Sequence, residues 1–340
     1  MIKETDIINY VHSKRFTDGM GIPQQLSDSL ALHFLAQGEY NRNYWFIHPV
    51  TGEKLVLRLN YGSQMHLKNQ IGYEFRALEL LRESGRTPLP IFLDEDTKSF
   101  SDGILVESYI EGRSLDYKKD LTQAMECLAQ IHSVAVPSGS GMIQPQNPAM
   151  AILSECKTMF SVYEASALKD AEIGARIQKM LERGAQIAAC EIGQSDDRCL
   201  INTELNSTNF IVNEQGGEVS LVDWEKPIIG EPAQDLGHFL APTTTFWKTD
   251  IILTEKEISD TLKQYVKAVH RRIDADHLYR KFGVYLPLNC LRGITWCAMA
   301  WVQYHLEQDG LRNESTYHKL AQYLSDAFLS VIEDFIYDRC

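Results

Sequence analysis

The sequence has little that would suit a nucleic-acid partner, a membrane or a secreted protein. Its 33 Lys and Arg residues are outnumbered by 46 Asp and Glu residues, which gives a formal net charge of −13. Because nucleic acids and anionic membrane surfaces are bound through basic faces, neither is expected as a partner. No uninterrupted apolar run approaches the length of a bilayer. The first residues also lack the basic and apolar segments of a signal peptide.

The cysteines do not form the pairs that a disulfide framework or a redox motif needs. There are seven of them, an odd number, and no two stand in a C-x-x-C motif. This pattern is typical of reduced thiols in a cytoplasmic protein. The motifs G-x-x-x-x-G-K-[ST] and G-x-S-x-G are also missing, which excludes the P-loop and α/β-hydrolase classes.

The chain divides into two parts with different hydrophobic patterns, and its 340 residues are enough for two domains. Residues 1–110 are rich in β-strand signals, and residues 111–340 carry long helical periodicities. The strands are expected at 29–35, 44–48, 54–59, 89–93 and 103–109, with a helix at 64–83. Helices are expected at 121–134, as a pair within 149–189, and from 254 to 340. The sequence therefore predicts an α+β protein.

Residues 200–224 carry the clearest chemical signal. Glu204 and Asn209 lie on a loop that runs into the apolar residues 210–212, and residues 213–218 have the Asn and Gly content of a hairpin turn. The returning strand then ends at Asp223. Phosphoryl transfer needs a group that orients the attacking hydroxyl and oxygen ligands for a metal ion. Two carboxylates and an amide in this frame indicate that chemistry, with Mg²⁺ bound by Asn209 and Asp223.

The arrangement resembles the aminoglycoside phosphotransferase and choline kinase-like family, which is related to the protein kinases. Where that family has His-Gly-Asp, this chain has Asn202-Thr203-Glu204. The resemblance spans roughly residues 25–310, on the usual size of such a pair of domains. It implies a bilobal kinase-like fold with a small β-rich N-lobe and a larger helical C-lobe. Thr203 in place of Gly indicates that the backbone does not need a positive φ there.

The resemblance also implies roles for the residues of this loop. Glu204 would be the base that accepts the proton of the substrate hydroxyl, and Asn202 would support the loop in place of the usual histidine. Asp235 matches the second aspartate of an Asp-Pro-Ala-x-Asp-Leu segment, where it would hydrogen-bond the loop. Alternatively, Asp235 is only a first-turn helix residue favoured by the helix dipole.

A basic residue and an acidic partner are expected in the N-terminal domain. Arg58 lies within the apolar run 55–59, and a cation on a buried strand is costly unless it is paired. In the family this position contacts the nucleotide phosphates, and Glu74 on the following helix is the best partner. The alternative is an edge-strand arginine that points into solvent.

Two further segments are assigned to the nucleotide through the resemblance. Residues 38–43, which include Asn41, occupy the place of the phosphate-covering loop, although one glycine in such a segment is also typical of a plain hairpin turn. Residues 105–112 resemble the hinge of the family, where backbone groups from Glu107 to Tyr109 would bind the base.

The predicted function is transfer of the γ-phosphate of ATP or GTP to a hydroxyl of a small molecule. The alternative is a weak or inactive relative that binds nucleotide and serves as a sensor or binding module, because both Asn202 and Glu204 depart from the family pattern. The sequence contains no signal for the acceptor, for ATP against GTP, or for the oligomeric state.

Overall fold

The computed structural model of the chain describes residues 3–38, 40–95, 103–190, 197–269, 273–306 and 314–337. These residues form two compact units. The first unit comprises residues 1–113, 136–142 and 211–227, and the second comprises 114–135, 143–210 and 228–340. The units are thus discontinuous along the chain, whereas the sequence analysis predicts one boundary after residue 110. Glu39 of the expected phosphate loop and Asp96 of the turn before the fifth predicted strand lie outside the described residues.

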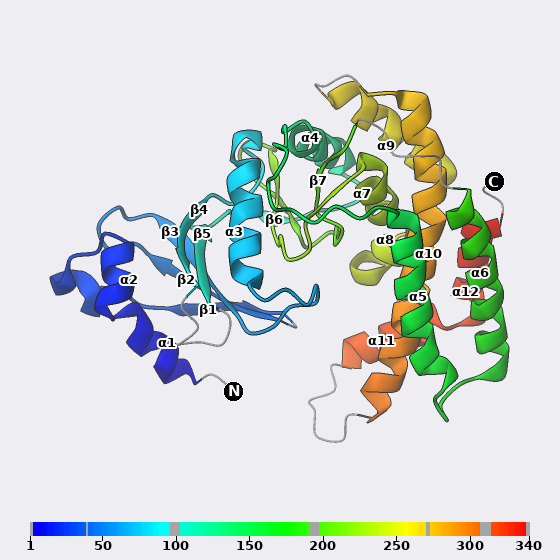
Figure 1. The fold of residues 1–340 in the computed structure, drawn as a ribbon, viewed down its shortest axis with the longest axis horizontal. Helices are drawn as coiled ribbons and strands as arrows, with labels where there is room; N and C mark the ends of the chain where they lie inside the picture. The colour runs from blue at the N-terminus through cyan, green and yellow to red at the C-terminus, as the bar shows by residue number, and fades with distance from the viewer. Residues whose placement is uncertain are drawn as a thin grey trace. The chain divides into compact units, whose positions relative to one another are not determined.

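The first unit is built around a five-stranded sheet of order β1-β2-β3-β5-β4, in which all neighbouring strands are antiparallel. Three short helices precede the sheet along the chain, and one longer helix follows β3 (Figure 1). The elements are α1 (Glu4–Val11), α2 (Lys14–Gly19), the 3₁₀ helix η1 (Gln24–Ser29), β1 (His33–Gln37), β2 (Asn41–Ile47), β3 (Lys54–Asn60), α3 (Gln70–Leu81), the 3₁₀ helix η2 (Arg82–Ser84), β4 (Pro90–Asp94) and β5 (Ile104–Ser108).

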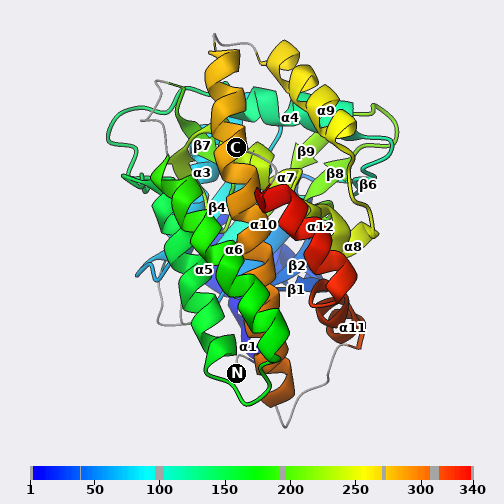
Figure 2. The ribbon, with the colours of Figure 1, turned by 90° about the vertical axis from the view of Figure 1, so that its right-hand side faces the viewer.

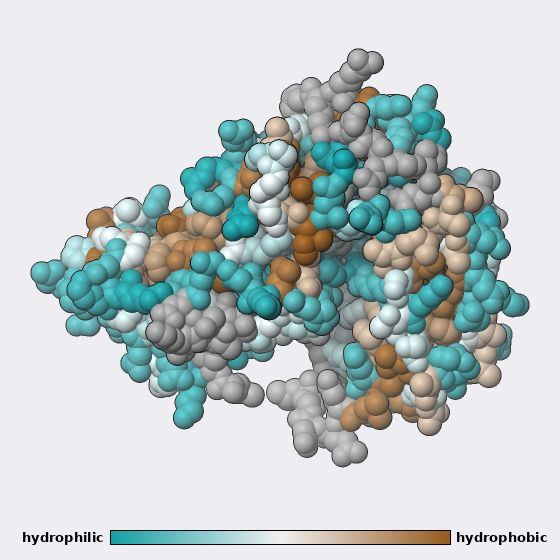
Figure 3. Space-filling model, viewed as in Figure 1, coloured by the Kyte–Doolittle hydropathy of each residue, from teal (hydrophilic) through white to brown (hydrophobic). Residues whose placement is uncertain are grey.

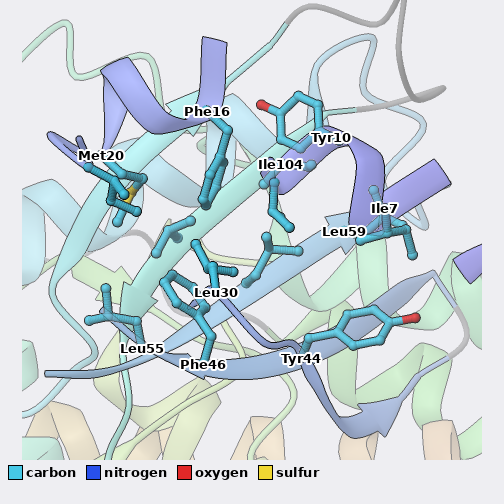
Figure 4. Close-up of a cluster of buried hydrophobic side chains, with 14 residues drawn as sticks. Ile7, Tyr10, Phe16, Met20, Leu30, Tyr44, Phe46, Leu55, Leu59 and Ile104 are labelled. Carbon is cyan, nitrogen blue, oxygen red and sulfur yellow. The ribbon is translucent and has the colours of Figure 1, made fainter. Parts of the chain in front are cut away.

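The hydrophobic core of this unit lies on one face of the sheet. Alternate residues of β3, such as Leu57 and Leu59, point to this face and are fully buried. Side chains from α1 and α2, including Tyr10 and Phe16, cover it (Figure 4). The ring of Phe16 meets those of Tyr10 and Phe46 edge-on at centroid distances of 5.6 and 6.2 Å. These two helices were not predicted from the sequence.

The opposite face of the same sheet carries polar groups. Arg58 stands between Leu57 and Leu59, so its side chain leaves the strand on the other side. It pairs across the sheet with Asn43 on β2 and with Leu105 on β5. Helix α3 reaches this face, since its Glu74 contacts Arg58. Because side chains alternate along the strand, neighbouring residues of β3 face an apolar core on one side of the sheet and a charged group on the other.

The second unit is mainly helical. Helices α5, α6 and α10 run side by side, and α12 packs against α6 and α10 (Figure 2). Its elements are α4 (Leu121–His132), α5 (Pro148–Glu164), α6 (Ala171–Ala189), β7 (Cys199–Ile201), β10 (Ile228–Gly230), α7 (Pro232–Phe239), α8 (Pro242–Thr249), α9 (Glu255–Ala268), α10 (Ala275–Leu306), α11 (Glu314–Tyr323) and α12 (Asp326–Tyr337). Gly237 lets α7 approach α10 closely, because a Cβ there would lie 2.9 Å from the backbone nitrogen of Leu286.

Two small sheets frame the segment that the sequence singled out. Strands β7 and β10 pair antiparallel in the second unit. Strands β6 (Arg113–Ser114), β8 (Phe210–Val212) and β9 (Val219–Leu221) form a three-stranded sheet, and β6 and β8 lie where the chain passes from one unit to the other. The turn after β8 is closed by two hydrogen bonds of 2.8 Å, from Asn213 N to Glu218 O and from Gly217 N to Asn213 O. The predicted hairpin is therefore confirmed.

The predicted α+β class is confirmed, with strands gathered in the first unit and helices in the second. The strand predicted at 29–35 exists but starts later, because Ser29 ends η1 and β1 spans His33–Gln37. The predicted helix at 64–83 is too long. It begins at Gln70, because the Asn69 side chain accepts a hydrogen bond from Gly72 N and so caps the first turn.

The surface in the view of Figure 3 is largely hydrophilic, with scattered apolar patches. Within the described ranges, none of the helices has the length and apolar character that crossing a bilayer requires.

Candidate active site

Arg58 is the centre of a charged network in the first unit. Its guanidinium is almost fully buried, which excludes an edge-strand arginine exposed to solvent. Its Nε lies 2.8 Å from Oε2 of Glu74, and its Nη2 lies 2.8 Å from Oδ1 of Asp223 and 2.7 Å from Oε1 of Glu225. One guanidinium thus faces three carboxylates. Burial lowers the pKa of Arg58, but Glu74, Asp223 and Glu225 more than reverse this effect, so Arg58 stays charged.

Glu74 is the most deeply buried of the three carboxyl groups. Its other contact is with Gln70, one helical turn earlier, whose Nε2 donates to Oε1 at 2.8 Å. Burial raises the pKa of Glu74 to about 8, although Arg58 acts in the opposite direction. Three carboxylates cannot all be neutralised by one guanidinium, so the innermost one is the easiest to protonate.

The segment Asp223–Trp224–Glu225 presents two carboxylates to Arg58. Trp224 is buried, and its Nε1 donates to the Leu221 carbonyl at 3.0 Å. This anchors the segment, while the residues on either side turn towards the guanidinium. Asp223 has φ 65°, a left-handed conformation that aspartate tolerates better than most residues. Glu225 was not selected from the sequence, although its place two residues after Asp223 was a usable signal.

Asn41 connects the turn after β1 to this network. The residue is buried at the start of β2, its Nδ2 donates to Glu225 Oε1, and its Oδ1 accepts a hydrogen bond of 2.9 Å from Asn60. The amide of Gly38 donates to the Asn41 carbonyl at 2.9 Å. Gly38 and Asn41 of the expected phosphate loop are therefore bonded to each other, and the Asn41 side chain is engaged within the unit.

Glu107 and Tyr109 lie at the end of β5 in the same unit. Burial raises the pKa of Glu107 to about 7, although the charge of Arg58 acts in the opposite direction. The amide of Tyr109 donates to the Lys54 carbonyl at 3.2 Å, and that of Ser108 donates to the Leu89 carbonyl at 2.9 Å. Both amides are thus used by the sheet. The Lys54 ammonium also lies 3.7 Å from the centroid of the Tyr109 ring.

In the second unit, Asp235 holds the loop that carries Glu204. Its carboxylate is fully buried and accepts hydrogen bonds from Asn202 N at 2.9 Å and Thr203 N at 2.8 Å. The His132 Nε2 lies 3.3 Å from the same carboxylate. Asp235 is therefore more than a first-turn helix residue, since it fixes two consecutive amides of the loop. The Asn202 side chain continues the pattern by accepting a hydrogen bond of 3.0 Å from Glu204 N.

The expectation that Thr203 avoids a positive φ is wrong. Its φ is 69°, in the left-handed region that a β-branched residue rarely adopts. The hydrogen bonds from the Asn202 and Thr203 amides to Asp235 hold the backbone in this shape. The loop therefore keeps the conformation that glycine adopts easily, and the substitution adds strain of roughly 1–3 kcal/mol.

The Glu204 side chain is paired with an arginine that was not selected from the sequence. Arg292 Nη2 lies 2.7 Å from Oε1 of Glu204. The same guanidinium contacts Glu155 on α5, at 2.9 Å from Nε and 3.2 Å from Nη2. The only sequence signal was a lone arginine beside the apolar residues Leu291 and Ile294 on a long helix.

Two further groups complete this region. Asn209 Nδ2 donates to the Glu204 carbonyl at 3.0 Å. This bond orients the side-chain amide of Asn209 and directs its Oδ1 away from the Glu204 carbonyl. His238 lies on α7, with Nδ1 3.3 Å from Asn289 Oδ1. Burial, and then the charge of Arg292, lower the pKa of His238 to about 4. The imidazole is therefore neutral at neutral pH.

The predicted residues thus fall into two groups, one in each unit. Asn41, Arg58, Glu74, Glu107, Tyr109 and Asp223 belong to the first unit, and Asn202, Glu204, Asn209 and Asp235 belong to the second. The two expected magnesium ligands, Asn209 and Asp223, therefore belong to different units. In the described part of the chain, no three His, Cys, Asp or Glu side chains gather in a metal-binding cluster.

Solved structures with a similar fold are kinases of small molecules. A spectinomycin phosphotransferase in complex with ADP and spectinomycin is 15% identical with a TM-score of 0.65, and the match covers 97% of each chain. A choline kinase from Cryptosporidium parvum is 11% identical with a TM-score of 0.65 over 98% of each chain. An ethanolamine kinase from Plasmodium vivax is 14% identical with a TM-score of 0.60, over 89% of this chain and 84% of that one. The likeness confirms the kinase-like fold.

Sequence comparison adds the family. No curated protein matches the chain. The model of the phosphotransferase enzyme family (APH), however, matches residues 31–275, which is more than half of the chain. This stretch includes Arg58, Glu74, Glu204, Asn209 and Asp223. The chain therefore belongs to the phosphotransferase enzyme family.

Proposed function

We propose that the protein transfers the γ-phosphate of ATP or GTP to a hydroxyl group of a small molecule. The observation that carries this proposal is the buried Arg58, whose guanidinium is shared by Glu74 of α3 and Asp223 of the β9 strand end. A strand cation paired with a helix glutamate is a recurring device for holding nucleotide phosphates in kinase folds. A structural ion pair alone would not require the partly exposed Asp223 carboxylate beside it.

Magnesium fits the donor atoms available in each unit. A carboxylate oxygen of Asp223 and the amide oxygen of Asn209 are hard ligands of the kind that Mg²⁺ takes, together with phosphate oxygens and water. Bound Mg²⁺ would neutralise the charge that develops on the transferred phosphoryl group. Even with the buried Glu74 protonated, Asp223 and Glu225 carry one negative charge more than Arg58 can balance, which favours a cation in the first unit.

Glu204 is the proposed general base. Its carboxylate would accept the proton of the acceptor hydroxyl and orient the oxygen for attack. The loop that carries it is fixed by Asp235, Asn202 and Asn209 through hydrogen bonds of 2.8–3.0 Å. A catalytic group gains from such fixation because a misplacement of about 1 Å can cost about 100-fold in rate.

The proposal is tested by a phosphotransfer screen with both nucleotides and Mg²⁺. The panel should contain spectinomycin, choline and ethanolamine, which are named for the similar structures, together with sugars, nucleosides and other amino alcohols. We expect nucleotide-dependent phosphorylation of at least one class of hydroxyl compound. If the protein binds nucleotide but phosphorylates no compound of the panel, the result would count against the proposed phosphotransferase activity.

That outcome would favour the second candidate, a nucleotide-binding protein that serves as a sensor or binding module. One observation supports it: the Glu204 carboxylate is already engaged in an ion pair with Arg292 at 2.7 Å. Turnover measured beside nucleotide binding separates the two functions.

A further inference from the structure

Arg292 has no assigned role in the site, yet its guanidinium contacts the Glu204 carboxylate. Arg292 lies on α10, and its helix neighbours Leu291 and Ile294 are fully buried. Its side chain is itself only 14% exposed. A cation in such a place is stable only when anions surround it. The identity and direction of those anions therefore show what the arginine does.

The two partners of Arg292 are bound in different ways. Glu155 meets the guanidinium edge with both oxygens, 2.9 Å from Nε and 3.2 Å from Nη2. This two-point contact fixes the plane of the guanidinium relative to α5. Glu204 meets only Nη2, at 2.7 Å from Oε1. Glu155 thus orients Arg292, and the oriented arginine then holds one of the two carboxylate oxygens of Glu204.

We infer that Arg292 is a positioning residue for Glu204 and that Glu155 acts through Arg292. This inference rests on the proposed function, in which Glu204 is the base. A glutamate has one more rotatable bond than an aspartate, so a glutamate in this loop has more side-chain conformations to choose from. The contact with Nη2 selects one of them. The loop backbone and the carboxylate are therefore positioned by separate sets of bonds, Asp235 and Asn202 for the first and Arg292 for the second.

The test compares Arg292→Lys with the wild type in steady-state kinetics. Lysine keeps the charge but cannot contact Glu155 and Glu204 with a planar fork. We expect kcat to fall by about 10- to 100-fold, as for a displaced catalytic group. The KM for nucleotide should change by less than about twofold, since Glu204 is not a nucleotide contact in the proposal. Glu155→Gln, which weakens the orientation of Arg292, should lower kcat in the same way but by less.

Arg176 provides a matched control in the same unit. It is also an arginine of low exposure, and it contacts Glu333 at 2.9 and 2.8 Å and Asp326 at 2.6 Å, both on α12. Arg176→Lys removes the same kind of forked ion pair from a place without a role in the reaction. We expect it to leave both kcat and KM unchanged. A fall in kcat equal to that of Arg292→Lys would show a general loss of helix packing and overturn the inference.

The decisive measurement is Arg292→Lys in a Glu204→Gln background. If the arginine acts through Glu204, the double variant should have the kcat of Glu204→Gln within about twofold. Losses that multiply, or an unchanged kcat in folded Arg292→Lys, would overturn the inference while the proposed function stands. If the wild-type protein shows no turnover on any acceptor, the proposed function is overturned. The inference about Arg292 is then overturned as well, because it depends on Glu204 being the base.

Discussion

Two buried arginines, Arg58 in the first unit and Arg292 in the second, are held by carboxylates in different numbers. Arg58 faces Glu74, Asp223 and Glu225, whereas Arg292 faces Glu155 and Glu204. With the buried Glu74 protonated, each arginine faces two ionised carboxylates, so the networks differ in the proposed roles of those carboxylates and not in net charge. In the first network Asp223 is a proposed metal ligand, and in the second Glu204 is the proposed base. We accordingly expect changes in the first unit to alter binding and changes in the second to alter turnover.

The largest effect is expected for Asp223→Ala. The variant removes a proposed magnesium ligand, so Mg²⁺-dependent nucleotide binding should be abolished. Titration calorimetry with nucleotide, with Mg²⁺ and with a chelator, measures this directly. Glu218→Ala is a suitable control, because Glu218 is an exposed carboxylate on the hairpin of the same segment. Unchanged Mg²⁺–nucleotide affinity in the Asp223 variant would count decisively against a metal-binding role.

Glu204→Gln tests the second network. It keeps size and polarity but removes the proton acceptor, so kcat should fall by about 100-fold or more while nucleotide affinity changes little. Glu204→Asp shortens the side chain and withdraws it from Arg292, so it should also be impaired. If the protein is instead a decayed enzyme, the two variants should behave in the opposite way. Glu204→Asp should then restore activity, and Glu204→Gln should have no measurable effect.

Arg58 is best tested by a single and a double variant. Arg58→Met should weaken nucleotide binding by about 10- to 100-fold, the worth of a charge-assisted phosphate contact. It should also lower the free energy of unfolding by about 1–3 kcal/mol, because the buried Glu74 carboxyl group loses its contact with Arg58. Adding Glu74→Gln removes the buried carboxyl group, so we expect stability to recover in part but not affinity. Recovery of affinity in the double variant would show that Arg58 is purely structural.

His238 gives the second unit a pH dependence. Its pKa is lowered to about 4, first by burial and then by Arg292, while the unfolded chain takes up the proton near pH 6.5. The stability that neutral His238 supplies is therefore present above pH 6.5 and is lost as the pH falls towards 4. The loss is at most about 3 kcal/mol. Denaturant unfolding from pH 7 to 4.5 should show a smaller decline for His238→Gln, and equal declines would contradict this assignment.

The smallest effect is expected for Thr203→Gly. Removing the side chain relieves the strain at φ 69°, but glycine adds flexibility to the unfolded chain, so the net gain in stability should be roughly 0–2 kcal/mol. Thr208→Gly, in the same loop, lacks a positive φ to relieve and should instead destabilise by about 0.5–1 kcal/mol. Thermal unfolding of the two variants measures the difference. Equal losses in both would show that Thr203 is not strained.

Much of the fold could be predicted because its signals are local. The apolar run at 55–59 predicts a strand, and the Asn and Gly residues of 213–218 predict a turn; both signals depend only on neighbouring residues. The helices before the sheet were missed because α2 has only six residues, too few for a clear periodicity. The shortened start of α3 depended on a cap at Asn69, a single side-chain contact.

The sequence by itself determined the kinds of chemistry available. Glu204, Asn209 and Asp223 stand on a loop and a returning strand that can be read along the chain, and the resemblance to the phosphotransferase family added Arg58 and Glu74 to them. Only the tertiary structure decided which charges meet. Arg292 is 88 positions from Glu204 and 137 from Glu155, and Arg58 is 167 from Glu225. Ion pairs at such separations depend on how whole helices and strands pack, and local periodicity carries no information about that packing.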